Sequence, residues 1–209
     1  MIRSGIYAIN IIFLVMGISL AADHDVPGDY KSIQLAIDSS NPGDTINIHS
    51  GIYDEHISIT KQLKLIGLVM EEEMPVISST TSGSVIIVRA DGVAIEGLNI
   101  TGKKSFDTIG ILVTSNNATL RDNLVTNCSD YAIKIVNSKN NKINNNTISY
   151  NNIGICLINS SSEITYNEIA YNHNAICYDV ISNIKSTISN NNIANNIYGM
   201  ILQNIKEPP

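Results

Sequence analysis

The sequence predicts an all-β protein, a single-stranded right-handed parallel β-helix (solenoid) with a short N-terminal capping helix. This prediction rests on two sequence motifs that repeat with nearly the same period. The first is an apolar residue, an asparagine three positions on and an apolar residue two further on; the asparagine returns at steps of 23, 21 and 24 residues, as Asn123, Asn146, Asn167 and Asn191. The second has apolar residues at alternate positions, as in Ile155-Cys-Leu157. Alternating β-branched residues between polar turns are typical of short stacked strands.

Composition limits the classes of function. The 209 residues suffice for one domain with a sizeable core, and aromatic residues are scarce, with no tryptophan. The formal net charge is −6. A nucleic-acid partner requires a basic face, so this charge argues against nucleic-acid binding.

The first residues indicate export. Arg3 precedes an apolar run from Ile6 to Leu20, and the small residues Ala21 and Ala22 follow. This arrangement is typical of a secretory signal peptide, here residues 1–22, whereas an uncleaved membrane anchor is the alternative. We therefore expect a secreted or extracytoplasmic protein, either free or at the cell surface.

The rest of the chain divides into a cap, a solenoid and a tail. In residues 23–44, Ser32 is a candidate N-cap for a short amphipathic helix that would cover the open end of the first coil. Brief alternating runs predict the β-helix over residues 45–205, with the most regular repeats in 93–204. Residues 206–209 form a short tail, and the absence of a second predicted capping helix allows end-to-end association of the last coil.

Some segments resemble a known superfamily. The run from Gly43 to Glu55, Gly-Asp-Thr-Ile-Asn-Ile-His-Ser-Gly-Ile-Tyr-Asp-Glu, and the run Leu63-Lys-Leu-Ile-Gly67 stand beside the later Asn/Ile repeats. Together they resemble the NosD-like proteins and the wider carbohydrate-binding and sugar-hydrolase, or pectin lyase-like, β-helix superfamily. The resemblance covers roughly Val26 to Asn204. It implies the fold, whereas one solenoid architecture hosts lyases, hydrolases, epimerases, adhesins and spacers.

The repeated asparagines have a structural interpretation. Equivalent residues of successive coils stack about 4.8 Å apart, as neighbouring strands do. Asn123, Asn146, Asn167 and Asn191 should therefore form an inward-facing ladder at a corner, where their amides bond to one another and to the turn backbone.

The cysteines give one specific expectation. Cys156 and Cys177 fall at the same outward position of consecutive coils, which we expect to face solvent, while Cys128 is left over. Side by side outside the cytoplasm, Cys156 and Cys177 could form a disulfide. A metal site with two thiolates is less favoured, because no histidine shares their register.

No cofactor is required by the composition, and copper and calcium are the two metals left open. Copper enters through the NosD resemblance, because NosD members help to mature copper in nitrous oxide reductase. His49 and His56, which are close in sequence with Asp54 and Glu55 between them, are the weak candidates for ligands. A calcium site would need clustered carboxylates, and the acidic residues 71–73 are better explained as a solvated loop.

The candidate functions follow from these features. Tyr150, Tyr166 and Tyr171 lie at or near turns and could stack on sugars, or simply shield the coil exterior. Asn117 and Asn145 are candidate glycosylation sites on turns. The leading hypothesis is a non-catalytic module that binds a polysaccharide or a cell-envelope protein. The alternatives are a polysaccharide lyase or hydrolase, for which the carboxylates of the repeats are few, and a NosD-like accessory protein in copper-enzyme maturation.

Overall fold

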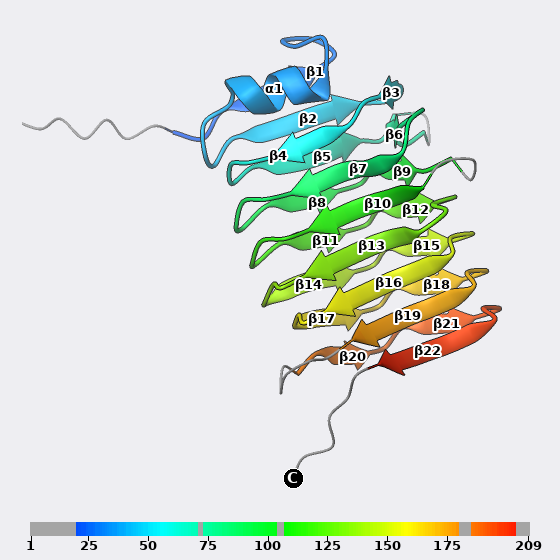
Figure 1. Cartoon of the computed structure of the whole chain (residues 1–209). Coiled ribbons are helices and arrows are strands. Elements are labelled where there is room, and N and C mark those ends of the chain that lie inside the picture. Colours follow the sequence, from blue (N-terminus) through cyan, green and yellow to red (C-terminus); the bar gives the residue numbers. More distant parts are fainter. Residues whose placement is uncertain (1–19, 71–72, 104–106, 180–184, 204–209) are drawn as a thin grey trace, which may run out of the picture.

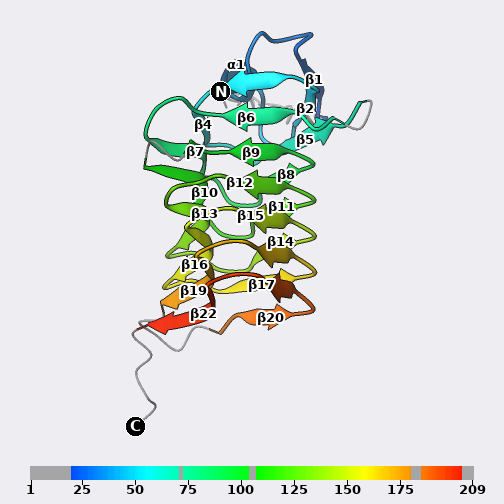
Figure 2. The same ribbon diagram turned by 90° about the vertical axis from the view of Figure 1, so that its right-hand side faces the viewer.

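Three parallel β-sheets wind around one apolar interior, and each coil of the chain contributes one strand to each sheet (Figures 1 and 2). The computed structural model describes residues 20–70, 73–103, 107–179 and 185–203. The signal peptide predicted over residues 1–22 therefore lies almost wholly outside the described residues, and the tail 206–209 lies entirely outside them. The predicted fold, a parallel β-helix with one short N-terminal helix, is confirmed.

The sheets are numbered here in the order in which the chain visits them. The first sheet contains β1 (Asp23–Val26), β2 (Thr45–His49), β5 (Lys64–Leu68), β8 (Ala94–Glu96), β11 (Thr119–Arg121), β14 (Asn141–Asn144), β17 (Ser162–Thr165) and β20 (Thr187–Ser189). The second contains β3 (Ile52–Asp54), β6 (Val76–Ser78), β9 (Asn99–Thr101), β12 (Leu124–Thr126), β15 (Thr147–Ser149), β18 (Glu168–Ala170) and β21 (Asn192–Ala194). The third contains β4 (Ile57–Ile59), β7 (Gly83–Val88), β10 (Thr108–Val113), β13 (Tyr131–Val136), β16 (Ile153–Ile158), β19 (Asn174–Asp179) and β22 (Tyr198–Gln203).

Corners between the sheets depend on the left-handed backbone region. Twelve described residues other than glycine have a positive φ, between 47° and 61°, and eight of them are asparagines. Asparagine tolerates this region better than other residues with a Cβ, because its short amide bonds to the local backbone. The abundance of asparagine in the second half of the chain thus reflects the number of corners. Three of the other four residues are tyrosines, which have no such preference.

Inward columns of isoleucine and leucine form the core. Ile95, Leu120, Ile143 and Ile164 occupy one register position of the first sheet, and all four are fully buried. Burying one such side chain stabilises the fold by about 1.5 to 3 kcal/mol. Each added coil therefore extends the core by the same set of contacts, which is why the repeat length is kept.

Helix α1 (Ile33–Ser39) covers the first coil (Figure 1). Its buried residues Ile33, Ala36 and Ile37 join the core, and the Ser32 hydroxyl accepts a hydrogen bond from the Leu35 amide at 3.3 Å, as expected for an N-cap. At the other end, the Lys61 ammonium donates to three carbonyls of the last helical turn and the residue after it. Both helix ends are thus satisfied, and α1 closes this end of the solenoid.

The opposite end is open in the described part of the chain. Met200 and Leu202 of β22 and Ile193 of β21 are 44%, 54% and 37% exposed, although they face the interior. Their equivalents one coil earlier include Ile169 and Ile176, which are fully buried. The last described coil therefore presents apolar interior surface.

Candidate functional site

The predicted asparagine ladder stands at the corner between the first and second sheets. The side-chain amide of each member donates to the side-chain oxygen of the next at 2.9 to 3.0 Å, through Asn123, Asn146, Asn167 and Asn191. The same oxygens accept from the backbone amides one coil earlier, for example from Asn123 N to Asn146 Oδ1 at 3.0 Å. These residues hold the corner and have no spare polar atoms for a ligand.

A second ladder, which the sequence analysis missed, stands at the corner between the second and third sheets. Asn151 donates to Asn172 and Asn172 donates to Asn196, each at 3.0 Å. Cys128 takes the place of an asparagine in the coil before, and its backbone amide donates to Asn151 Oδ1 at 2.9 Å. The signal was available in the sequence, because these asparagines follow the first ladder at a constant spacing of five residues.

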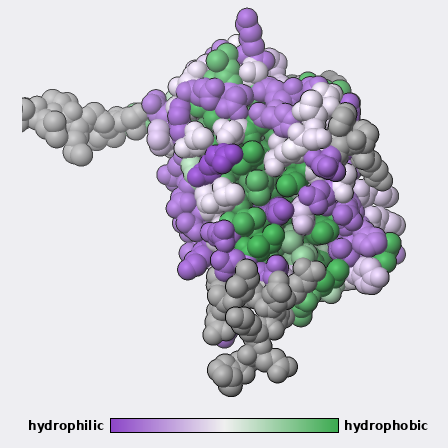
Figure 3. Space-filling view, viewed as in Figure 1, coloured by the Kyte–Doolittle hydropathy of each residue, from purple (hydrophilic) through white to green (hydrophobic). Residues whose placement is uncertain are grey.

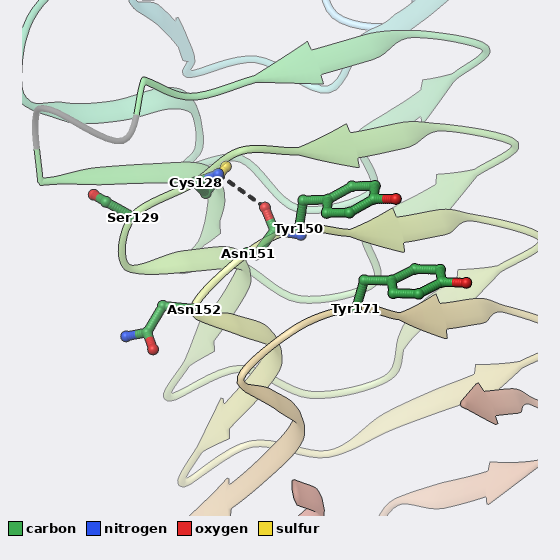
Figure 4. Close-up of a pocket in the computed structure, with 6 residues that line it drawn as sticks. All are labelled: Cys128, Ser129, Tyr150, Asn151, Asn152 and Tyr171. Carbon is green, nitrogen blue, oxygen red and sulfur yellow. Dashed lines mark hydrogen bonds between the residues drawn. The ribbon is translucent and has the colours of Figure 1, made fainter. Parts of the chain in front are cut away.

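Tyr150 and Tyr171 directly precede two members of the second ladder and form a stacked pair (Figure 4). Their ring centroids are 5.3 Å apart with an interplanar angle of 7°, and each side chain is 53% exposed. Their φ angles are 61° and 58°. This backbone conformation disfavours tyrosine, and an asparagine would fit at both positions. The presence of tyrosine here therefore indicates that the rings have a function.

The corner column that contains the pair is Asn127, Tyr150, Tyr171 and Asn195, all with positive φ. Because the two rings face each other, their inner faces are covered. Each tyrosine is nevertheless 53% exposed, so part of the pair is accessible to solvent. An open pocket of about 400 Å³ adjoins the rings, and its lining is uncharged: Cys128, Ser129, Tyr150, Asn151, Asn152 and Tyr171 (Figure 4).

Tyr166 belongs to a different corner. It directly precedes Asn167 of the first ladder, has φ 58° and is 63% exposed. The three tyrosines that the sequence grouped together therefore separate into the pair Tyr150 and Tyr171 and a single ring on another edge of the solenoid.

Cys156 and Cys177 are register partners on β16 and β19, as predicted, but the prediction that they face solvent is wrong. Their side chains lie on the outer face of the third sheet, yet the two residues are only 2% and 7% exposed. Figure 3 shows hydrophobic residues gathered on this face of the molecule. All three cysteines are free thiols in the structure, so the expected disulfide is not formed and stays a prediction for the oxidised protein.

The two thiols titrate as a pair. The Cys156 thiol donates a hydrogen bond to the Cys177 sulfur, which raises the pKa of Cys156 and lowers the pKa of Cys177 to about 7. Burial opposes ionisation of both thiols, and the carboxylate of Asp179 does so as well. The ammonium group of Lys134 favours both thiolates. The third thiol, Cys128, is buried, and desolvation raises its pKa to about 12.

The two histidine candidates have separate partners. His49 Nε2 lies 3.4 Å from Asp25 Oδ1. His56 Nδ1 is 2.7 Å from the Ser84 carbonyl, which can only accept, so Nε2 is left to accept from the hydroxyls of Ser79 and Thr81 at 2.7 and 2.6 Å. Both ring nitrogens of His56 are therefore occupied by hydrogen bonds within the protein.

The remaining sequence candidates lie on the surface. Asn117 and Asn145 are exposed at corners, with φ 58° and 55°, and glycosylation there stays a prediction. The register neighbours of Glu163 are Lys142 and Thr187, and those of Glu168 are Thr147 and Asn192. Neither carboxylate therefore has another carboxylate beside it on an adjacent coil.

A family model described as NosD, periplasmic copper-binding protein, matches residues 30–206. The chain belongs to the NosD family. A comparison with curated proteins finds no match. No helix among the described residues of this NosD member has the length and apolar character needed to cross a membrane.

Two solved structures share the fold of this NosD chain. One is a pectin methylesterase in complex with a hexasaccharide, with a TM-score of 0.53 and 16% identity over 78% of this chain and 66% of that one. The other is an alginate lyase from Paenibacillus sp. strain FPU-7, with a TM-score of 0.57 and 15% identity over 81% of this chain and 75% of that one. The chain thus spans about two thirds of the methylesterase, and at these identities the likeness concerns the fold alone.

The family description raises the question of which residues could hold copper. Among the described residues there is no group of three or more histidines, cysteines, aspartates or glutamates that could hold a metal ion. The same finding leaves calcium without a described carboxylate cluster. The pair Cys156 and Cys177 offers two soft ligands side by side, which suits a monovalent soft ion and not one that needs four ligands.

Proposed function

We propose that this NosD-family protein is an extracytoplasmic β-helix module that binds a neutral, extended glycan on the aromatic pair Tyr150 and Tyr171. The observation that supports this most is the parallel, half-exposed ring pair at backbone angles that tyrosine disfavours. A sugar ring presents apolar C–H faces between polar edges, so it stacks on an aromatic face while its hydroxyls bond to nearby amides.

The pocket beside the rings favours an uncharged sugar. Its lining includes the side-chain amide of Asn152, and none of its six residues carries a charge. The chain itself has a formal charge of −6, which disfavours a polyanion at long range. We therefore expect neutral oligosaccharides to bind better than uronate chains, although the structural neighbours are named for pectin and alginate.

Binding to cellohexaose, xylohexaose and oligogalacturonate, measured by isothermal titration calorimetry, tests the proposal. We expect a neutral hexasaccharide to bind, and each of the substitutions Tyr150→Asn and Tyr171→Asn to lower its affinity about tenfold, which corresponds to about 1.4 kcal/mol. Asparagine suits the backbone at both positions, so the free energy of unfolding should change by less than about 1 kcal/mol.

Tyr166→Asn is the matched control, because Tyr166 has the same backbone region and similar exposure on another corner. It should leave glycan affinity unchanged. Equal losses in all three variants would contradict the assignment of the pair, and no heat with any of the oligosaccharides would contradict the glycan itself.

A further inference from the structure

A second pocket, of about 310 Å³, lies at the corner where the chain passes from the third sheet into the first. Strands β14, β17 and β20, which follow one another in the first sheet, each contribute their first residue to it (Figure 2). Its lining includes three charged residues, Lys142, Glu163 and Lys185, and three with hydroxyl groups, Ser161, Ser162 and Thr187. None of these lines the pocket beside Tyr150 and Tyr171, so the two pockets suit different classes of ligand.

The three charged residues come from successive coils. Lys142 and Glu163 are register partners, and Lys185 lies two residues before Thr187, the register partner of Glu163 on the next coil. Within the described part of the chain, none of the three takes part in an ion pair or in a side-chain hydrogen bond. The pocket therefore offers two ammonium groups and one carboxylate to a ligand.

The hydroxyl of Ser162 is an independent sign of a ligand. Ser162 lines the pocket and is 4% exposed, and its Oγ has no hydrogen-bond partner among the described residues. The equivalent side chains one coil earlier and one coil later do have partners: Asn141 Oδ1 accepts from the Ala118 amide at 2.9 Å, and Ser186 Oγ accepts from the Ser162 amide at 3.1 Å. An unpaired buried hydroxyl is unfavourable, and a ligand at the base of the pocket would give it a partner.

From these groups we infer that the pocket binds an acidic α-amino acid, a small ligand with two carboxylates and one ammonium group. The charges of this ligand are the reverse of those in the pocket. Its carboxylates pair with Lys142 and Lys185, and its ammonium group pairs with Glu163. The Ser162 hydroxyl donates to one of the carboxylate oxygens. This site is independent of the proposed glycan site.

Other ligand classes complement the pocket less well. A simple anion is attracted by the two ammonium groups but repelled by the carboxylate of Glu163, and a simple cation meets the opposite combination. A neutral sugar leaves all three charges without a partner. The volume also agrees, because about 310 Å³ is at the small end of the range for ligand pockets, about 300 to 1,000 Å³.

Exposure limits the affinity. Lys142, Glu163 and Lys185 are all exposed, so water and salt screen their charges. We therefore expect a Kd on the order of 100 μM at low ionic strength, and weaker binding as salt is added.

Equilibrium dialysis of the full chain with radiolabelled L-glutamate tests the inference, with unlabelled compounds as competitors. We expect one site per chain. L-Glutamine and glutarate, each of which lacks one of the three charged groups, should compete at least tenfold less well than L-glutamate, and L-lysine should not compete. Inorganic phosphate should compete no better than glutarate.

Substitutions assign the individual groups. Lys142→Gln and Ser162→Ala should each lower the affinity for L-glutamate about tenfold, and Ser162→Ala removes a hydroxyl without a described partner, so the fold should not suffer. Glu163→Gln should weaken L-glutamate binding but strengthen glutarate binding, because it removes the carboxylate that repels a dianion. A residue with a merely structural role would not invert this preference.

Lys64→Gln is the matched control. Lys64 is an exposed lysine in the same register column as Lys142, three strands earlier in the first sheet, and it does not line the pocket. It should leave L-glutamate affinity unchanged. The inference is overturned if the wild type retains no L-glutamate, if glutarate or phosphate competes as well as L-glutamate, or if Lys64→Gln loses as much affinity as Lys142→Gln. Tyr150→Asn should retain L-glutamate binding, so failure of the glycan proposal would be seen separately.

Discussion

At the residue scale, a single ladder asparagine supports three coils. The Asn146 amide donates to the Leu120 carbonyl, to the Asn144 carbonyl and to Asn167 Oδ1, while its oxygen accepts twice from Asn123. Asn146→Ala would leave several buried groups unpaired, each at a cost of about 1 to 3 kcal/mol. We expect the free energy of unfolding to fall by at least about 3 kcal/mol, measured by urea denaturation.

The adjacent Asn145 provides the control. It is exposed at φ 55°, a backbone region that glycine adopts freely. Asn145→Gly should change the free energy of unfolding by less than about 1 kcal/mol. Similar losses in the two variants would show that the corner backbone, and not the buried ladder, is what Asn146 stabilises.

Residue-scale features also show what a sequence can and cannot predict. The first ladder was predictable because asparagine recurs between apolar residues at a fixed offset. The second ladder has the same signal, but Cys128 stands in place of its first asparagine. The backbone amide of Cys128 donates to Asn151 Oδ1, a bond that the identity of the residue does not reveal. Burial of Cys156 and Cys177 was not predictable either, because alternation within a strand tells which face of the sheet a side chain takes and not how far that face is covered.

At the element scale, the N-terminal cap depends on one buried carboxylate. In the uncleaved chain, Asp44 accepts from the backbone amides of Ala22 and Asn41 and from His24, and these bonds hold its pKa below the ordinary value. After cleavage of residues 1–22, the bonds from Asn41 and His24 would remain. Because the folded pKa is lower than that of the unfolded chain, near 3.9, Asp44 contributes stability above that pH and loses it as pH falls through the folded value.

Asp44→Asn tests this assignment. We expect the variant to unfold at a lower temperature than the wild type at pH 7, and the gap to shrink as pH falls below about 4. Hydrogen exchange in β1 and β2 should follow the same course. A gap in Tm that is constant from pH 7 to pH 2.5 would contradict the role of the charged carboxylate.

At the scale of the whole molecule, the two ends of the solenoid differ. Helix α1 covers one end, whereas at the other end of the described part of the chain β20, β21 and β22 form an open edge with exposed Ile193, Met200 and Leu202. The helix covers the strand edges at the N-terminal end, so the open end of one chain cannot pair with the capped end of another. We therefore propose that two chains associate through their open ends as a two-fold dimer.

Sedimentation velocity over a range of concentrations measures this association. The full chain should form dimers and not longer assemblies, and Met200→Lys with Leu202→Lys should return it to monomer. As a control, Leu35→Lys changes an exposed apolar residue of the covered end and should leave the dimer intact. A wild-type chain that stays monomeric at high concentration would mean that its open edge does not self-associate.

The positive-φ corners give this architecture a form of modularity. Four successive coils present a positive-φ residue at the same corner, namely Asn127, Tyr150, Tyr171 and Asn195. At Tyr150 the turn is held by Asn151, whose side-chain amide donates to the Ser149 carbonyl. Such a position can change from asparagine to tyrosine and back without repacking the interior. Ligand preference can therefore diverge one coil at a time along a lineage, while the solenoid beneath it remains the same.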